Sequence, residues 1–223
     1  MPSTESARST ASKRVGVLAL QGDVLEHLTV LEALGATGVP VRKPMDLEGV
    51  QALVMPGGES TTMSLLLGSS GLLPELEKLL ADGTPVLGTC AGMILLSREI
   101  LNGRSDQVSF GAIDLVVRRN AFGRQLESFE TDLAVSGIDG GPMHAVFIRA
   151  PVVESAGPSV EVLASVVLES QAQHSGGTAG ESARSRAVVC RQGPVIVAAF
   201  HPELSGDGRL HQLLLDQIEV EGD

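Results

Sequence analysis

The chain has 223 residues, of which 43% are hydrophobic and 19% are charged, a composition typical of a folded protein. Its 16 basic and 27 acidic residues give a net charge of −11, so it lacks the positive charge that attracts nucleic acids and anionic membranes. It has five Phe and neither Trp nor Tyr, and therefore few aromatic rings on which bases could stack. These properties exclude DNA, RNA and membrane surfaces as expected partners.

Two cysteines, Cys90 and Cys190, are too few for a disulfide framework in a chain of this length. Residues 1–13 contain no apolar stretch and do not resemble a secretory signal. No run approaches the roughly 18 apolar residues that a membrane-spanning helix needs. We therefore expect a cytoplasmic protein with one domain at 14–223 after a disordered tail at 1–13.

The first half of the chain predicts strands that alternate with helices. The apolar run RVGVLAL at 14–20 is rich in β-branched residues, as buried strands are. Asp23 is placed to cap a helix in which leucines from Leu25 to Leu34 form one stripe. Further strands are expected at 39–42, 51–55 and 85–88, and further helices at 60–67, 72–81 and 93–101. This alternation indicates a parallel sheet covered on both faces.

The second half of the chain predicts antiparallel additions to that sheet. Strands are expected at 110–118, 133–135, 145–149, 160–168, 187–191 and 195–200, and a last helix at 209–220. The segment 169–186 is rich in Ser, Gly, Ala and Gln, which is typical of a mobile loop. The expected fold class is therefore α/β, a single-domain, doubly wound mixed sheet that is mostly parallel.

A candidate nucleophile lies in Gly88-Thr-Cys-Ala-Gly92, between a predicted strand and a predicted helix. A nucleophile on such a sharp turn needs small neighbours, because backbone passes close to it on both sides. The helix N-terminus beyond Cys90 also favours negative charge, and therefore a thiolate. Taken alone, the pattern fits a small buried cysteine equally well.

A candidate base lies in His201-Pro202-Glu203, which follows the apolar strand at 195–200. The proline favours extended backbone at His201, and residues two apart in extended backbone point the same way. Glu203 could then orient the imidazole and stabilise the imidazolium while His201 takes the thiol proton. Taken alone, a polar strand end with incidental charge is the more common explanation.

The third segment is Pro56-Gly-Gly-Glu-Ser60, again after a strand. Paired glycines let a backbone N–H face a cleft, so the N–H groups of Gly58 and Ala91 could form an oxyanion hole. The Lys-Ser/Thr of a phosphate-binding loop is absent. Because ligands of doubly wound sheets bind beyond the carboxyl ends of the strands, the three segments together predict a cysteine acyl-transfer site.

The sharp turn at Gly88-Thr-Cys-Ala-Gly92 and the distant His201-Pro-Glu203 resemble the corresponding motifs of the class I glutamine amidotransferases. Four stretches are similar to the glutaminase subunits of the two-subunit pyridoxal 5′-phosphate synthase: GVLALQG at 16–22, PGGESTTM at 56–63, RNAFGR at 119–124 and FIRAP at 147–151. The resemblance covers about residues 14–220 and implies a flavodoxin-like fold. It also implies that this subunit releases ammonia from L-glutamine and that a separate (βα)8-barrel subunit uses the ammonia to build pyridoxal phosphate.

By this resemblance Cys90 is the nucleophile, His201 the base and Glu203 the residue that orients it. The motifs also imply contacts with glutamine from Gln21, Gly58, Glu59, Ser60, Arg119, Ile148 and Arg149. The guanidinium groups of Arg119 and Arg149 suit the free carboxylate of glutamine, although without the resemblance surface salt bridges would be preferred for both. The tail at 1–13 and the long loop at 169–186 depart from the family pattern.

The remaining cysteine and histidines are not expected to be functional. Cys190 lies in an apolar strand without small neighbours, so we expect an inert core thiol. His27 is expected to be solvated or at an interface. The other histidines show no ligand spacing (His144, His174 and His211). We therefore expect no metal and no cofactor.

Two other functions remain open. A glutaminase could serve another ammonia acceptor, such as an imidazole glycerol phosphate synthase, although ESTT at 59–62 and RNAFGR at 119–124 argue against it. A non-catalytic protein on the same fold would typically have lost Cys90, His201 or Glu203, and all three are present.

Overall fold

A computed structural model describes residues 12–119, 128–168 and 184–218. Its centre is a seven-stranded sheet with the strand order β10-β11-β12-β4-β3-β1-β2. These strands are β1 (Arg14–Leu18), β2 (Thr37–Val41), β3 (Ala52–Met55), β4 (Val86–Thr89), β10 (Glu161–Leu168), β11 (Arg184–Gln192) and β12 (Val195–Ala198). The five strands from β12 to β2 run parallel, whereas β11 is antiparallel to both of its neighbours. The predicted mixed, mostly parallel sheet is confirmed.

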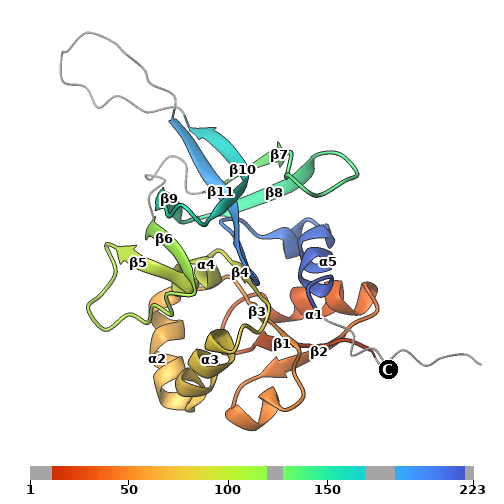
Figure 1. The fold of residues 1–223 in the computed structure, drawn as a ribbon, viewed down its shortest axis with the longest axis vertical. Coiled ribbons are helices and arrows are strands. Elements are labelled where there is room, and N and C mark those ends of the chain that lie inside the picture. Colours follow the sequence, from red (N-terminus) through yellow and green to blue (C-terminus); the bar gives the residue numbers. More distant parts are fainter. Residues whose placement is uncertain (1–11, 120–127, 169–183, 219–223) are drawn as a thin grey trace, which may run out of the picture.

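Helices cover both faces of the parallel strands. They are α1 (Val24–Ala33), α2 (Ser60–Ser70), α3 (Leu72–Ala81), α4 (Ala91–Leu96) and α5 (Arg209–Leu215), with two 3₁₀ helices, η1 (Pro44–Leu47) and η2 (Pro202–Leu204). Figure 1 shows α1 and α5 on one side of the central strands and α2, α3 and α4 on the other. All residues of β3, β4 and β12 are buried, as expected for strands enclosed on both faces.

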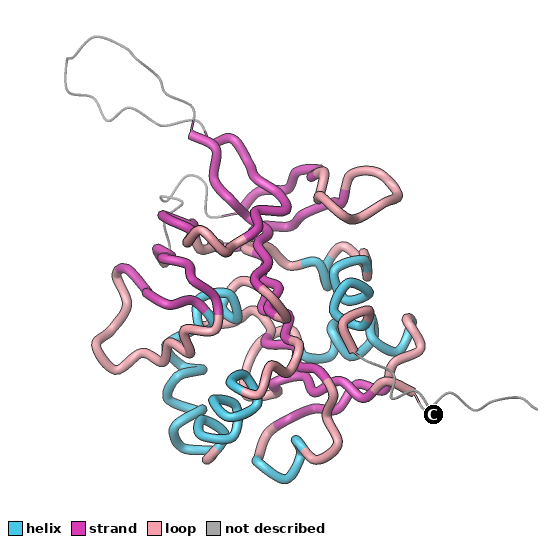
Figure 2. The backbone as a smooth tube through the Cα atoms, viewed as in Figure 1, coloured by secondary structure: helices cyan, strands magenta, loops and turns pink. Residues whose placement is uncertain are grey.

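Two small sheets account for the other strands of the second half. One contains β5 (Ser97–Leu101), β6 (Ile113–Arg118) and β9 (Val152–Ala156), and the other pairs β7 (Ser128–Leu133) with β8 (Met143–Ile148). The helices gather in one half of the molecule, and β7 to β10 lie in the other (Figure 2). Of the strands predicted as antiparallel additions, β10 and β11 join the central sheet, and β12 also joins it but runs parallel to β4.

The helix predicted at 93–101 is wrong in its second half. The helix α4 ends at Leu96, and Ser97 has extended backbone while its hydroxyl donates to the Met93 carbonyl at 2.7 Å. The chain continues as β5, which pairs with β6. The strand predicted at 133–135 is β7, at 128–133, and β9 was not predicted.

The predicted ends and the predicted loop also need correction. Ser12 and Lys13 do not belong to a disordered tail, because their side chains donate to the carbonyls of Gly35 (3.0 Å) and Leu215 (2.6 Å). The start of β11 at Arg184 takes three residues from the predicted loop. The rest of that tail and that loop lie outside the described residues. The last helix ends at Leu215, before the predicted 220.

The buried face of α1 differs from the predicted leucine stripe. Leu25 is 70% exposed, whereas His27 is completely buried together with Val30 and Leu31. A histidine therefore occupies a core position on this helix, contrary to the expectation that it is solvated or at an interface. In the described ranges no helix is long and apolar enough to cross a membrane.

Candidate active site

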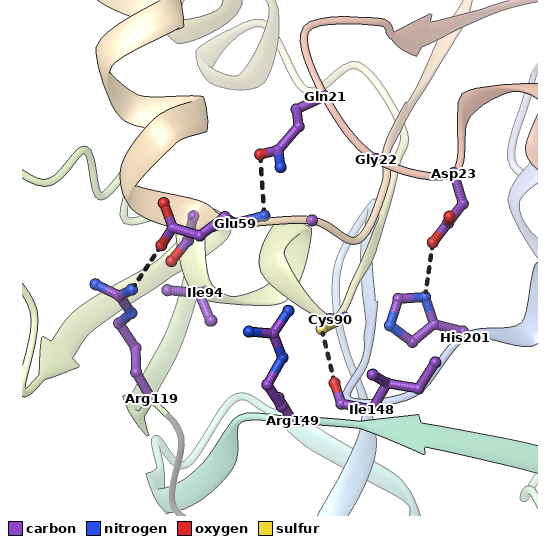
Figure 3. Close-up of a pocket in the computed structure, with 12 residues that line it drawn as sticks. Gln21, Gly22, Asp23, Glu59, Cys90, Ile94, Arg119, Ile148, Arg149 and His201 are labelled. Carbon is purple, nitrogen blue, oxygen red and sulfur yellow. Dashed lines mark hydrogen bonds and ion pairs between the residues drawn. The ribbon is translucent and has the colours of Figure 1, made fainter. Parts of the chain in front are cut away.

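A cavity of about 330 Å³ lies where four neighbouring parallel strands end. The strands β12, β4, β3 and β1 are adjacent in the sheet, and the segments that follow them meet at this edge. The cavity is lined by Gln21, Gly22, Asp23, Gly58, Glu59, Ser60, Cys90, Ile94, Arg119, Ile148, Arg149 and His201 (Figure 3). This lining includes every predicted substrate contact, and Glu203 is buried behind it beside His201.

Cys90 occupies a strained turn between β4 and α4. Its backbone φ of 47° and ψ of −101° lie in a region that residues with a side chain rarely adopt. The Cys90 N–H donates to the Ala198 carbonyl at 2.8 Å, and the thiol lies 3.8 Å from the Ile148 carbonyl oxygen. Cys90 as a whole is only 6% exposed, and the turn places it in the cavity lining, the geometry of a nucleophile elbow.

The small residues around the elbow are required by space. A Cβ on Gly92 would overlap with the carbonyl group of Met55, and one on Gly88 would come within 2.6 Å of the Leu96 side chain and 2.8 Å of the Gly92 backbone. The strand β3 therefore packs directly against the backbone of the elbow. This is the physical reason for the Gly-x-Cys-x-Gly pattern.

His201 is fixed by a hydrogen bond of its backbone and by a carboxylate beside its imidazole. Its N–H donates to the Val146 carbonyl at 2.9 Å, and its Nδ1 lies 2.8 Å from Oε1 of Glu203. Both side chains are buried. Glu203 lies in the 3₁₀ helix η2, so a tight turn, and not the extended backbone expected from the sequence, brings it beside the imidazole.

The charges around His201 favour its protonated form. Burial acts to lower the pKa of His201, but hydrogen bonds with Cys90 and Glu203 and the charges of both raise it to about 10. Burial raises the pKa of Glu203, and the hydrogen bond with His201 offsets only part of this effect. His201 is therefore a protonated, positively charged imidazolium at neutral pH.

Asp23 was expected to cap α1, but its side chain makes no capping hydrogen bond. Its Oδ2 instead lies 3.3 Å from Nδ1 of His201, the atom that Glu203 also faces. Donor atoms of Asp23, His201 and Glu203 lie within 4.8 Å of one another, close enough to surround a cation. A cation on Nδ1 would break the hydrogen bond that orients the ring, so the arrangement suits an oriented base better than a metal centre.

The opposite side of the cavity carries an arginine with fixed partners. Glu59 caps α2 by accepting from the N–H groups of Thr61 and Thr62 at 3.0 and 2.7 Å. Burial acts to raise the pKa of Glu59, but these hydrogen bonds lower it to about 2. The resulting carboxylate accepts from Arg119 at 2.9 Å. The salt bridge considered for Arg119 is thus present, and it lies in the cavity wall.

Gln107 joins two residues of this wall, and no sequence motif pointed to it. Its amide oxygen accepts from Arg119 at 2.6 Å, and its amide nitrogen donates to the Ser60 hydroxyl at 3.0 Å. Two predicted substrate contacts are therefore held by one side chain from the segment before β6. A lone glutamine in a loop carries no signal from which this role could be read.

The other predicted contacts come from two further segments. Gln21 accepts from the Glu59 N–H at 3.0 Å and so ties the end of β1 to the glycine pair. Ile148 is the last residue of β8, and Arg149 directly after it has a φ of 45°. Figure 3 shows Arg149 beside Cys90, with Glu59 and Arg119 on one side of the sulfur and His201 on the other.

Comparison with known proteins agrees with this geometry. The model of the SNO glutamine amidotransferase family matches residues 17–220. A relative from Rhodococcus jostii (strain RHA1), the pyridoxal 5′-phosphate synthase subunit PdxT, is 55% identical over 92% of this chain and 96% of its own. The protein of the same name from Nocardia farcinica (strain IFM 10152) is 50% identical over 100% of this chain and 93% of its own.

A solved crystal structure of a glutamine amidotransferase superposes with a TM-score of 0.77 at 45% sequence identity. The superposition covers 91% of this chain and 97% of the solved one. The matches extend over nearly the full length of each partner, so they include the elbow, the glycine pair and the His-Pro-Glu segment together. The chain therefore belongs to the SNO glutamine amidotransferase family.

Proposed function

We propose that this chain is the glutaminase subunit of a pyridoxal 5′-phosphate synthase and releases ammonia from L-glutamine for vitamin B6 biosynthesis. The names of its relatives support this assignment. The observation that carries it is the strained Cys90 in a cavity that is also lined by two arginines and by His201, which is paired with the buried Glu203.

The reaction has two halves, and His201 serves in both. The Cys90 thiolate attacks the side-chain carbonyl carbon of glutamine, and His201 gives its proton to the departing nitrogen so that ammonia leaves. A water then attacks the thioester, losing a proton to His201, and glutamate is released. The N–H groups of Gly58 and Ala91 stabilise the oxyanion in each half. Glu203 keeps the imidazole oriented and stabilises its charged form.

The charged groups of the cavity wall match the polar end of glutamine. Arg119 and Arg149 are suited to its α-carboxylate, because a guanidinium binds a carboxylate through two parallel hydrogen bonds. Gln21, Gly58, Glu59, Ser60 and Ile148 line the same space and position the rest of the substrate. Both cysteines are free thiols, which suits a cytoplasmic enzyme.

The ammonia passes to a synthase subunit, which we propose to be a (βα)8 barrel. The alternative acceptor, an imidazole glycerol phosphate synthase, has no support from the relatives named above. The deciding experiment mixes the chain with the candidate synthase subunit and supplies glutamine labelled with ¹⁵N in the amide. Label in pyridoxal phosphate supports the proposal, and glutamate formation without labelled product would point to another acceptor.

The first prediction is that the Gly58 N–H is directed at the oxyanion only when the synthase subunit is bound. Glutaminase activity should then rise by about 100-fold or more when that subunit is added, because one missing oxyanion donor costs that much. The Gly57–Gly58 peptide is bounded by two glycines, and the φ of Gly58 is 145°. Its N–H can therefore change direction without a steric penalty from a side chain. The measurement is the rate of glutamate formation with and without the partner. Equal rates would show that no gate of this kind exists.

The second prediction concerns the space between the glycine pair and the base. A Cβ on Gly57 would overlap with the imidazole of His201. We therefore expect Gly57→Ala to move the ring and lower kcat by about 100-fold, at the low end of the value of general base catalysis. Gly68→Ala in α2 is the matched control, since nothing lies within 4 Å of its added Cβ. Equal activity of the two variants would mean that His201 does not need this position.

A further inference from the structure

A pair of buried histidines lies directly behind the proposed triad. His27 of α1 and His211 of α5 are both completely buried, and Nδ1 of His27 lies 2.8 Å from Nε2 of His211. Neither takes part in the mechanism given above. Two imidazoles in the core are costly unless their polar atoms have partners, so their contacts are informative.

The pair contacts the triad through Glu203. One carboxylate oxygen, Oε1, is used by His201, whereas Oε2 has no hydrogen-bond partner within the part of the chain that is described. Nε2 of His27 lies 3.5 Å from Oε2, and both side chains are fully buried. Hydrogen bonds of catalytic groups are often long before substrate binds. The same nitrogen lies 3.3 Å from the hydroxyl of Thr89, next to the nucleophile.

Both histidines are neutral, so each carries one N–H. Burial and the charges of His211 and His201 lower the pKa of His27 well below its ordinary value. Burial lowers the pKa of His211 to about 4, although the charge of Asp207 opposes this effect. The question is therefore which nitrogen of each ring holds the proton.

The contacts favour one arrangement of the two protons. If Nε2 of His211 donates to Nδ1 of His27, the N–H of His27 is on Nε2 and faces the Glu203 carboxylate. Of the four ring nitrogens, Nδ1 of His211 is then an acceptor without a partner among the described residues. In the opposite arrangement that atom is a buried N–H without an acceptor, and a lone pair of His27 faces the carboxylate. The Thr89 hydroxyl can pair with Nε2 of His27 in either arrangement, so the second is disfavoured by its unpaired N–H and by the repulsion between that lone pair and the carboxylate.

We propose that His27 is a positioning residue for Glu203 and that His211 fixes the tautomer in which His27 donates to it. The inference rests on the proposed glutaminase function. It extends the triad by two hydrogen bonds: His211 donates to His27, and His27 donates to Oε2 of Glu203. His201 donates to the other oxygen of that carboxylate, Oε1. The donated hydrogen bond stabilises the ionised carboxylate that burial disfavours.

The other charged groups near Glu203 and the two histidines also affect their pKa values. Asp23 at the start of α1 raises the pKa of Glu203, and the charge of His201 lowers it. Asp207, before α5, acts on His211. Removal of the His27 donor leaves Asp23 and burial less opposed, so Glu203 becomes easier to protonate. Since a protonated Glu203 cannot stabilise the imidazolium, activity should fail at a higher pH than in the wild type.

The test compares His27→Leu with His27→Gln in the complex with the synthase subunit. Leu fills the core position without a donor, and we expect kcat to fall about 10-fold or more with KM nearly unchanged. The acid limb of the kcat profile should move to higher pH. The Gln amide restores a donor and should recover part of both effects. His144→Leu, a surface histidine on β8, is the matched control and should leave the acid limb in place.

Two outcomes would overturn the proposal. One is an unchanged acid limb in His27→Leu. The other is an equal loss in the Leu and Gln variants, which is what a purely structural role predicts. If His27→Leu does not fold because it leaves the His211 donor unpaired, the double variant His27→Leu/His211→Leu provides an apolar pair for the same measurement.

A readout that does not depend on activity separates this inference from the proposed function. In the free chain labelled with ¹⁵N-histidine, NMR should show His27 protonated on Nε2 and His211 also on Nε2. In His211→Leu, His27 should lose this single tautomer. Protonation of His27 on Nδ1 in the wild type would refute the inference even if the chain is a glutaminase, whereas inactivity with the expected tautomers would refute only the function.

Discussion

Replacement of Cys90 by alanine is expected to abolish glutaminase activity, with a loss on the order of 10⁴-fold or more in kcat. The sulfur is the atom that forms the thioester, and no neighbouring group in the cavity lining can replace it. The fold should persist, because Ala fits the same tight turn and the contact of the sulfur with the Ile148 carbonyl is long, at 3.8 Å. The measurements are the steady-state rate with the synthase subunit and the melting temperature.

Cys190→Ala is the control for this variant. Cys190 is completely buried in β11, and burial raises the pKa of its thiol to about 12, so it has almost no thiolate at neutral pH. A glutamine-derived electrophile should therefore add once to the wild type, at Cys90, as peptide mass spectrometry can show. Labelling at Cys190, or activity retained in Cys90→Ala, would contradict the assignment of the nucleophile.

The second large effect is expected at the carboxylate beside His201. Glu203→Gln keeps the size of the side chain but removes the charge that stabilises the imidazolium, so kcat should fall about 100-fold or more while the fold is preserved. His201→Ala removes the base itself and should cost about 10-fold more again. Small and equal losses in both variants would indicate that another residue is the base.

Asp23→Asn provides the control, because Asp23 and Glu203 face the same nitrogen of His201. Asp23 is farther away, at 3.3 Å against 2.8 Å, and its side chain is 40% exposed whereas that of Glu203 is fully buried. Water screens the exposed charge, so we expect Asp23→Asn to lose less than about 10-fold. A loss as large as that of Glu203→Gln would show that the two carboxylates share the orienting role.

The fold class and three of the segments around the cavity could be predicted from residue patterns because their signals are local, whereas Gln21, Arg119, Ile148 and Arg149 were expected only from the family resemblance. Each active segment follows a short apolar run, and in a parallel sheet such runs end at the same edge. The glycines near Cys90 are also readable, since they reflect backbone contacts at that turn. These signals required no knowledge of which strands are neighbours.

The features that were missed depend on contacts between distant segments. The segment at 97–101 contains good helix formers such as Arg98 and Glu99, but pairing with β6 overrides that local preference. His27 looks like a polar residue on a surface helix until α5 and η2 are placed against it. Gln107 gains its role from contacts with Ser60, at the start of α2, and with Arg119, which follows β6.

The close approach of Gly57 to His201 and of the Met55 carbonyl to Gly92 has a consequence for protein engineering. A graft of Cys90, His201 and Glu203 onto another α/β scaffold would carry the reactive atoms but not the space between them. The same clearance is needed at Gly22, where a Cβ would overlap with the Gly57 carbonyl. A designer who wishes to move this chemistry must first choose a host backbone that tolerates glycine at each of these positions, and only then place the three reactive side chains.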